Sequence, residues 1–271
     1  MGPIVTPEEL VERLDEVVVC HVGTTMGGVD PIGPYVERHV AGARFASLED
    51  DLAAPAAPIL GRHPLPSPES FATTLGRLGI APVDPVVAYD DRGGAVAARL
   101  VWMLRIIGQD ASLLDGGLDG WDGPTGSGRG APRVPRRVER EPVPWPSAAI
   151  ADADAVADHL DGGGVVIDSR DPARYRGEVE PLDAVAGHVP GAINVAFAGN
   201  LVDGRFRPAA DLAARFAPVA DDPRAIVSCG SGVSACHNAL AMEAAGLRRP
   251  RVYVGSWSGW SSDPARPVAT S

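Results

Sequence analysis

Short apolar runs alternate along this chain with segments in which apolar residues recur at helical spacing. Runs such as residues 86–89 and 225–227 hold three or four apolar residues and are bounded by Asp, Pro or Gly. That pattern is typical of buried strands in a parallel sheet. Segments such as 95–107 have the period of a helix and end just before a glycine, a frequent C-cap. The alternation predicts an α/β fold in which each parallel sheet is flanked by helices.

Predicted elements cover most of both halves of the chain. The predicted strands are residues 17–20, 43–46, 86–89, 111–114, 165–167, 193–195, 225–227 and 251–254. The predicted helices are residues 34–38, 67–78, 95–107, 152–159, 209–216 and the segment that ends at Gly246. A further helix opens at Thr6-Pro7-Glu8-Glu9, where Thr and the Glu three residues later form a capping box. Residues 47–67 are predicted to be irregular.

The two halves repeat each other. Two motifs occur once in each half: His-Val-x-Gly-Ala at residues 39–43 and 188–192, and a glycine-rich segment ending in Gly-Trp at 116–121 and 255–260. The second pair gives an offset of 139 (260 minus 121), which carries Cys229 onto Asp90. The sequence therefore predicts tandem duplicated domains, of which only the second has a thiol at this point.

A stretch rich in Pro and Gly separates the halves. It has no apolar period and carries five arginines, at 129, 133, 136, 137 and 140. We expect a non-catalytic N-terminal domain over residues 1–123, a linker over 124–147 and a catalytic domain over 148–271. The arginines are expected to be solvated, and a docking patch is the alternative.

Composition limits the classes of partner. The net charge of −11 argues against binding to nucleic acid or to an anionic membrane surface. There is no apolar run long enough to span a bilayer. Three cysteines without metal-ligand spacing indicate neither a disulfide framework nor a metal site. We expect a cytoplasmic protein with reduced thiols, no metal and no cofactor.

The main candidate for chemistry is Cys229-Gly-Ser-Gly-Val-Ser234, which lies between a predicted strand and a predicted helix. The glycines allow the N–H groups of Gly230, Gly232, Val233 and Ser234 to point at whatever Cys229 carries. We expect a reactive thiolate, and a small buried core cysteine is the alternative. Cysteine phosphatases need an arginine six residues after the cysteine, and Ala235 stands there. A non-enzymatic sulfur carrier or interaction module also stays open.

Several of these motifs resemble the two-domain rhodanese-type sulfurtransferases. They are Asp168-Ser-Arg, Arg174-Tyr-Arg-Gly, Gly187-His-Val-Pro-Gly-Ala, the Cys229 loop and Gly255-Ser-Trp-Ser-Gly-Trp260. The resemblance implies two rhodanese folds and a persulfide intermediate on Cys229. It also implies a small-molecule sulfur donor, an acceptor that is cyanide, a thiol or thioredoxin, and a monomer.

Within that family, the neutral loop resembles the 3-mercaptopyruvate branch. That resemblance implies donor binding by Arg174 and a Ser–His–acid arrangement of Ser231, His63 and Glu49 or a neighbouring Asp. The branch often has a second arginine about nine residues after Arg174, but the sequence there reads Glu180-Pro-Leu-Asp183.

Charge guides the expected donor. Thiosulfate is a dianion, and a loop without a cation serves it poorly, so 3-mercaptopyruvate is favoured and thiosulfate is the alternative. Arg174 would bind the donor's carboxylate, or would form an ion pair with Asp168, Asp171 or Glu178.

The remaining candidates are interpreted as structural. Cys236 is expected in the core two turns into its helix, and Cys20 is expected to be buried at the position matching Asp168. His188 is expected to make structural hydrogen bonds. Trp257 and Trp260 are expected to pack against the last helix, and Trp257 could instead line the rim of the site.

Overall fold

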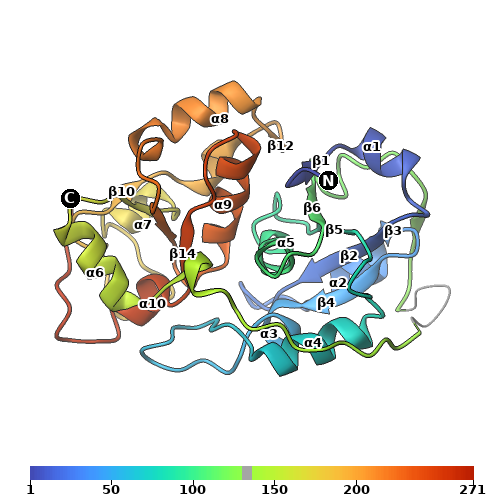
Figure 1. Ribbon diagram of the computed structural model, residues 1–271, viewed down its shortest axis with the longest axis horizontal. Helices are drawn as coiled ribbons and strands as arrows, with labels where there is room; N and C mark the ends of the chain where they lie inside the picture. Colours follow the sequence, from blue (N-terminus) through green and yellow to red (C-terminus); the bar gives the residue numbers. More distant parts are fainter. Residues whose placement is uncertain (130–135) are drawn as a thin grey trace. The chain divides into compact units, whose positions relative to one another are not determined.

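The computed structural model describes residues 1–129 and 136–271. They form two compact units (Figure 1). Unit 1 consists of Met1–Ala54, Leu65–Trp145 and Asp203–Arg205. Unit 2 consists of Pro55–Pro64, Pro146–Val202 and Phe206–Ser271. A ten-residue segment from the first half of the chain thus folds with the second half.

Unit 1 is built on a five-stranded parallel sheet with the strand order β1-β6-β5-β2-β4. Its strands are β1 (Ile4–Val5), β2 (Val18–Gly23), β4 (Arg44–Ser47), β5 (Val86–Tyr89) and β6 (Ala111–Leu114). A short antiparallel pair, β3 (His39–Val40) and β7 (Thr125–Gly126), adds to it. The helices are α1 (Pro7–Glu12), α2 (Gly33–Glu37), α3 (Leu48–Asp51), α4 (Pro68–Arg77) and α5 (Ala97–Ile106).

Unit 2 repeats this plan, with the strand order β10-β9-β13-β14-β8 and all pairs parallel. Its strands are β8 (Ile150–Ala151), β9 (Val166–Asp168), β10 (Ile193–Asn194), β13 (Ile226–Ser228) and β14 (Arg251–Tyr253), with a β11 (Leu201–Val202) and β12 (Arg205–Phe206) hairpin. The α-helices are α6 (Ala153–Asp161), α7 (Pro172–Tyr175), α8 (Ala209–Arg215), α9 (Ser234–Ala244) and α10 (Ser256–Trp260), and three 3₁₀ turns are η1 (Ser147–Ala149), η2 (Phe197–Asn200) and η3 (Ala217–Val219).

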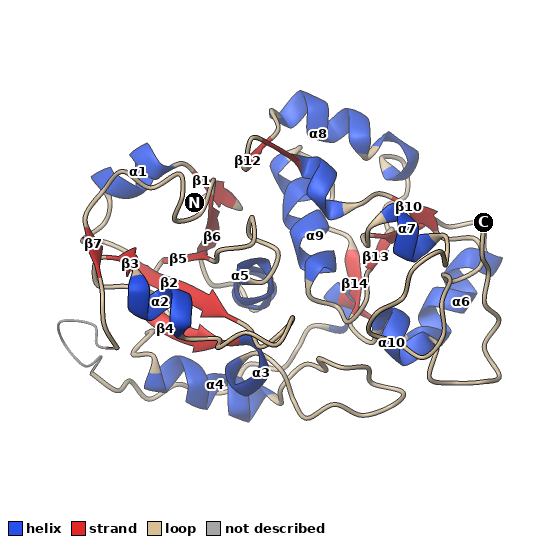
Figure 2. Ribbon diagram, turned by 180° about the vertical axis from the view of Figure 1, so that it is seen from behind, coloured by secondary structure: helices blue, strands red, loops and turns tan. Residues whose placement is uncertain are grey.

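The predicted fold class is confirmed in both units. Helix α5 packs on β5 and β6, and α9 packs on β13 and β14, so each central strand is followed by a helix that covers its own sheet (Figure 2). Strands β5 and β13 are buried along their whole length, which explains why their sequences are continuously apolar up to the last residue.

The strand register corrects one expected equivalence. Strand β2 runs to Gly23 rather than ending at Cys20, because its apolar and buried character continues through His21 and Val22. His21 pairs with Tyr89 at the end of β5, as Asp168 pairs with Ser228 at the end of β13. His21 is therefore the counterpart of Asp168, and the expectation that Cys20 takes that place is wrong.

The end of the predicted linker, residues 136–145, packs against unit 1, so it is not solvated along its whole length. Val138 N donates to Gly76 O at 3.0 Å, and Arg140 donates to Ile80 O and Gln109 Oε1 at 3.1 and 2.7 Å. The expectation of a solvated side chain is therefore wrong for Arg140. Arg133 lies outside the described residues.

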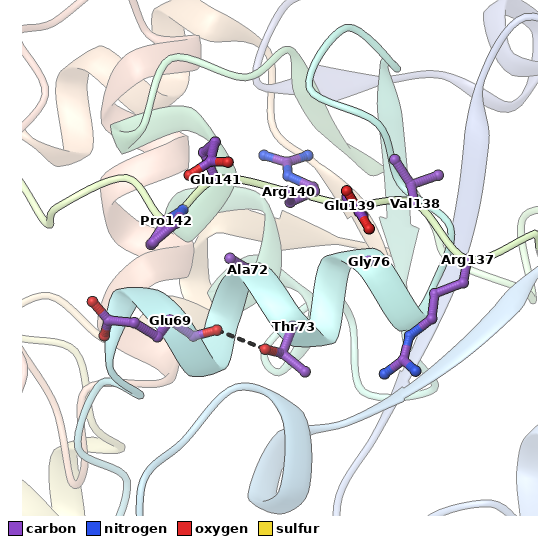
Figure 3. Close-up of a pocket in the computed structure, with 10 residues that line it drawn as sticks. All are labelled: Glu69, Ala72, Thr73, Gly76, Arg137, Val138, Glu139, Arg140, Glu141 and Pro142. Carbon is purple, nitrogen blue, oxygen red and sulfur yellow. Dashed lines mark hydrogen bonds between the residues drawn. The ribbon is translucent and has the colours of Figure 1, made fainter.

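A pocket of about 640 Å³ lies between this stretch and α4. Figure 3 shows residues 137–142 running alongside the helix, where the Thr73 hydroxyl donates to Glu69 O at 2.9 Å. Its lining contains no cysteine and no histidine, so it offers no group for sulfur chemistry.

Several local predictions can be compared with the structure. The capping box at Thr6 and Glu9 is confirmed. Residues 47–67 are not irregular throughout, because Ser47 caps the short helix α3 through Asp50 N. Trp257 and Trp260 belong to the last helix, α10, and both are buried, so Trp257 is not a rim residue. None of the helices within residues 1–129 and 136–271 is long and apolar enough to cross a membrane.

Candidate active site

Cys229 is the residue directly after β13, at the carboxyl end of the central strand of unit 2. Its side chain is almost wholly buried, and Gly232 N lies 3.2 Å from Cys229 Sγ in hydrogen-bonding geometry. The carbonyl of Cys229 accepts from Trp257 N at 3.0 Å. The cysteine is thus held through its carbonyl, and its sulfur faces the N–H group of Gly232.

The loop geometry depends on glycine at position 232. Gly232 has a φ of +75°, a region that L side chains rarely adopt, and a Cβ there would lie 2.4 Å from Val254 O. The backbone of Val254, which directly follows β14, therefore contacts the loop at Gly232. In this conformation Gly232 N points towards Cys229 Sγ.

Ser256 supports Cys229 from α10, and sequence reasoning missed it. Its Oγ accepts from Cys229 N at 3.0 Å, donates to Tyr253 O at 2.8 Å and lies 3.9 Å from Cys229 Sγ. Ser256 is fully buried with a φ of +50°, a strained conformation for a residue with a Cβ. The signal in the sequence is the Gly-Ser-Trp-Ser motif, which supports the repeat and the family resemblance but in which only the tryptophans are given a role.

Ser231 and His63 are brought together by the fold. Ser231 Oγ and His63 Nδ1 are 2.8 Å apart, and both side chains are buried. The segment that carries His63 is anchored in unit 2: Arg62 N donates to Ser258 Oγ at 3.1 Å, and Ser262 Oγ donates to Pro58 O at 2.7 Å. Ser231 is two residues after Cys229 in the same loop, and a serine hydroxyl bonded to an imidazole can pass on or share a proton.

Arg174 is paired with a carboxylate that the sequence analysis did not consider. Its Nε and Nη2 donate to Glu180 at 3.3 and 2.6 Å. Asp168 instead binds Arg170, and Glu178 binds Arg176, so the expected alternatives for Arg174 are wrong. Burial opposes ionisation of Glu180, but the hydrogen bond and charge of Arg174 outweigh it and lower the pKa of Glu180. The ionised form of Glu180 is therefore favoured, and its hydrogen bonds orient the guanidinium.

Two cationic side chains lie next to the Cys229 loop. The charge argument, which rested on a loop without a cation, did not take them into account. A methyl group built on Gly230 would lie 3.1 Å from Arg62 Nη2 and 3.4 Å from Arg174 Nη1. Arg62 also forms an ion pair with Asp183, at the edge of a pocket of about 340 Å³ that both residues line. Sequence reasoning missed Arg62 because it lies 167 positions before Cys229 (229 minus 62).

Comparisons with known proteins agree with this geometry. Residues 152–263 match the rhodanese-like domain family. The chain is 41% identical to a probable 3-mercaptopyruvate sulfurtransferase of Pseudomonas aeruginosa, over 98% of both chains. It is 38% identical to a putative thiosulfate sulfurtransferase, SseB, of Mycobacterium tuberculosis, over 98% of this chain and 96% of that one. The chain belongs to the rhodanese-type sulfurtransferases.

Solved structures support the same assignment for this sulfurtransferase. The crystal structure of SseA, a 3-mercaptopyruvate sulfurtransferase from Escherichia coli, superposes with a TM-score of 0.81 at 29% identity, over 95% of this chain and 99% of that one. A 3-mercaptopyruvate sulfurtransferase from Leishmania major gives 0.84 at 28% identity, over 96% and 74%. The protein is therefore an enzyme, and the expectation of sulfur transfer on a rhodanese fold is confirmed.

In unit 1 of the sulfurtransferase, the loop that matches the Cys229 loop holds a buried acid side chain. Asp90 directly follows β5, and its side chain is buried. Four backbone N–H groups donate to its two oxygens at 2.7 to 2.8 Å: those of Arg92, Gly94, Val96 and Ala97. The Asp90 side chain is thus held by N–H groups of its loop, and in unit 2 the thiol at the equivalent place is faced by Gly232 N.

Which acid completes the expected Ser–His–acid arrangement stays a prediction, because the contacts of Glu49 do not decide it. Glu49 belongs to unit 1, where Oε1 accepts from Thr24 Oγ1 at 2.6 Å and from Thr25 N at 3.0 Å. Burial raises the pKa of Glu49, but these hydrogen bonds outweigh it, so the pKa is lowered on balance.

The other cysteines of the sulfurtransferase and His188 have structural surroundings. Cys236 is buried as expected, but it lies in the first turn of α9 rather than two turns in, and its thiol donates to Gly232 O at 3.3 Å. Burial raises the pKa of the Cys20 thiol to about 12, which removes it as a nucleophile. His188 contacts Tyr175 O through Nδ1 at 2.8 Å and stacks on the Tyr175 ring.

Proposed function

We propose that this sulfurtransferase takes sulfur from 3-mercaptopyruvate, carries it as a persulfide on Cys229 and delivers it to a thiol or to cyanide. The observation that carries the choice of donor is the hydrogen bond between Ser231 Oγ and His63 Nδ1, beside the cysteine. Pyruvate must leave as an enolate, which needs a proton, whereas sulfite leaves thiosulfate without one. A Ser–His pair at this place suits the first donor.

The first half-reaction is a displacement at sulfur. The Cys229 thiolate attacks the thiol sulfur of the donor, an S–S bond forms, and the C–S bond breaks with its electron pair moving into the enolate of pyruvate. The proton on the donor's sulfur is lost and one proton is gained by the enolate carbon, so the step balances as persulfide anion plus pyruvate. We assign to Ser231 the hydrogen bond to the keto oxygen, where negative charge develops, and to His63 the exchange of a proton with it; their mutual hydrogen bond supports this.

The second half-reaction returns the cysteine to its starting state. An acceptor thiolate or cyanide attacks the outer sulfur, the S–S bond to Cys229 breaks, and the thiolate is regenerated. Until then the outer sulfur is stabilised by N–H groups of residues 230–234, in the way that four N–H groups hold the Asp90 carboxylate. Two separate half-reactions predict ping-pong kinetics.

The proposal places the nucleophile in the second half of the chain. Residues 148–271 carry Cys229, and residues 1–123 are proposed as the copy without a nucleophile, joined by the linker 124–147, although their 55–64 segment folds with unit 2 and brings His63 to Ser231. A buried carboxylate saturated with four N–H donors has no nucleophilic role comparable to a thiolate. The three free cysteines are compatible with a reducing cytoplasm, and we propose a monomeric enzyme.

Thiosulfate is the second candidate donor, because Arg62 and Arg174 both lie near Gly230 and together could bind a dianion. The deciding experiment measures kcat/KM for both donors in one assay and the mass of Cys229 after exposure to each. A gain of about 32 Da on Cys229 with 3-mercaptopyruvate and a higher kcat/KM for that donor are expected.

The matched pair of variants is Cys229→Ser and Cys236→Ser. Loss of transfer in the first and retention in the second are expected, since the Cys229 sulfur faces Gly232 N, whereas the Cys236 thiol donates to Gly232 O. A preference for thiosulfate would reverse the donor assignment. Transfer by Cys229→Ser near the wild-type rate would remove the persulfide mechanism.

A further inference from the structure

Two guanidinium nitrogens converge on the residue after Cys229. Measured from a methyl group built on Gly230, Arg62 Nη2 is at 3.1 Å and Arg174 Nη1 is at 3.4 Å. Within residues 1–129 and 136–271, neither of these two nitrogens has a hydrogen-bond partner. They are therefore available to an anion held against the Cys229 loop.

The opposite edges of both guanidinium groups are held by buried carboxylates. Arg62 Nη1 donates to Asp183 Oδ1, and Asp183 Oδ2 lies 3.7 Å from Arg174 Nη2. Glu180 binds the Nε and Nη2 edge of Arg174. The two carboxylate side chains are 8% and 3% exposed, whereas those of the two arginines are 28% and 20% exposed. Asp183 and Glu180 thus orient the arginines and leave one N–H edge of each accessible to solvent.

We infer that Arg62 is a second donor-binding residue, which with Arg174 binds the carboxylate of a 2-oxo acid thiol donor. This inference deepens the proposed function and rests on it for the identity of the donor. Carboxylates prefer such paired, charge-assisted N–H donors. The position nine residues after Arg174 is Asp183, so no second arginine is available there. The second guanidinium group comes instead from Arg62 in the 55–64 segment.

Backbone contacts already account for the position of the segment, so the Arg62 side chain is not needed to anchor it. Arg62 N donates to Ser258 Oγ, and a Cβ on Gly61 would lie 2.5 Å from Gly255 O, which shows how closely the two backbones approach. The same short segment carries His63 to Ser231. One segment therefore brings both a proton-exchanging side chain and an anion-binding side chain to Cys229.

The test compares alkylation of Cys229 by iodoacetate, which carries a carboxylate, with alkylation by iodoacetamide, which does not. The readout is the ratio of the two rate constants, followed by mass spectrometry of the Cys229 peptide. Arg62→Gln is expected to lower this ratio by about 10-fold or more, as Arg174→Gln should. Arg176→Gln, which removes the same charge from an exposed ion pair with Glu178, is the control and should leave the ratio unchanged.

Two further variants separate binding of the donor from a purely structural ion pair. Asp183→Asn breaks the ion pair but keeps Arg62, which loses only its orientation, so the ratio should fall less than in Arg62→Gln. Arg62→Lys keeps the charge and should recover part of the loss. An unchanged ratio in Arg62→Gln, or an equal loss in Asp183→Asn, would overturn the inference.

The outcome for the donor is measured separately. In single turnovers with 3-mercaptopyruvate, Arg62→Gln should slow formation of the Cys229 persulfide by about 10- to 100-fold at low donor concentration, with a smaller loss for inorganic polysulfide, which has no carboxylate. If the wild-type enzyme forms no persulfide with 3-mercaptopyruvate, the proposed function fails, while the alkylation ratio still decides whether Arg62 binds anions.

Discussion

His63 Nδ1 lies 2.8 Å from Ser231 Oγ, although 168 positions separate the two residues in the chain. The contact exists because Pro55–Pro64 folds with unit 2. Both side chains are buried, so the hydrogen bond is shielded from competing water. Under the proposed mechanism this pair exchanges a proton with the leaving group, and donors are then distinguished by whether their leaving group needs one.

His63→Asn is therefore expected to act on one donor much more than on the other. Its kcat with 3-mercaptopyruvate should fall by about 100-fold or more, because proton transfer to the enolate is lost. With thiosulfate, whose leaving group needs no proton, kcat should stay within about threefold of the wild-type value. Steady-state assays with both donors make the measurement. Equal losses with the two donors would mean that His63 only shapes the loop.

Ser231→Ala provides the matched variant for the same pair. Since the two side chains act together, the double variant should lose no more activity with 3-mercaptopyruvate than the more impaired single variant. Additive losses would contradict a shared role. Thermal unfolding of each variant checks that the loop is still folded.

Ser256 offers a test of how Cys229 is positioned. Ser256→Ala removes the acceptor of Cys229 N and should lower the free energy of unfolding by about 1–3 kcal/mol, because a buried N–H loses its partner. Ser256→Gly loses the same bond but relieves the φ of +50°, so it should cost about 1 kcal/mol less. Urea unfolding gives both values, and a Gly variant less stable than the Ala variant would contradict strain at this position.

Asp90 is expected to stabilise unit 1 and not to take part in transfer. Asp90→Asn places an amide N–H₂ against backbone donors, and the resulting unpaired groups should cost about 2–4 kcal/mol. Hydrogen exchange of the α5 amides reports this locally. The exposed neighbour Asp91→Asn is the control and should change little. At temperatures where Asp90→Asn remains folded, kcat should match the wild-type value, and a large loss of kcat would contradict the assignment.

Acid should weaken unit 1 through His21. The side chain is buried among Tyr35, Phe45 and Tyr89, and its two ring nitrogens have no hydrogen-bond partner within the described part of the chain. Burial lowers the pKa of His21 from 6.5 to about 4. The native state therefore prefers the neutral ring, so the stabilisation is complete above pH 6.5 and is lost as the pH falls towards 4.

The loss attributable to His21 should approach about 3 kcal/mol at pH 4. His21→Phe keeps an aromatic ring but has no group to protonate, so its free energy of unfolding should vary less between pH 6.5 and pH 4 than that of the wild type. Urea unfolding at several pH values makes the comparison. Parallel pH profiles for the two proteins would show that His21 does not titrate on unfolding.

Much of the architecture was predictable because short apolar runs and helical periodicity are visible in local sequence. Strands β5 and β6 were predicted at their observed bounds, since buried parallel strands are short, predominantly apolar runs. The internal repeat correctly placed Asp90 and Cys229 after equivalent strands. The short helix α10 was not predicted, because five residues rich in Gly and Ser lack a readable helical period.

By itself, the sequence determined the α/β class, the duplication and the position of Cys229 in a glycine-rich loop after a buried strand. Only the tertiary structure decided what surrounds that cysteine. His63, Arg62, Ser256 and Glu180 reach the site from separate parts of the chain, and their contacts depend on which elements pack together. Periodicity and spacing report neighbours within one element, whereas a site assembled by packing joins residues whose distance along the chain carries no information about their distance in space.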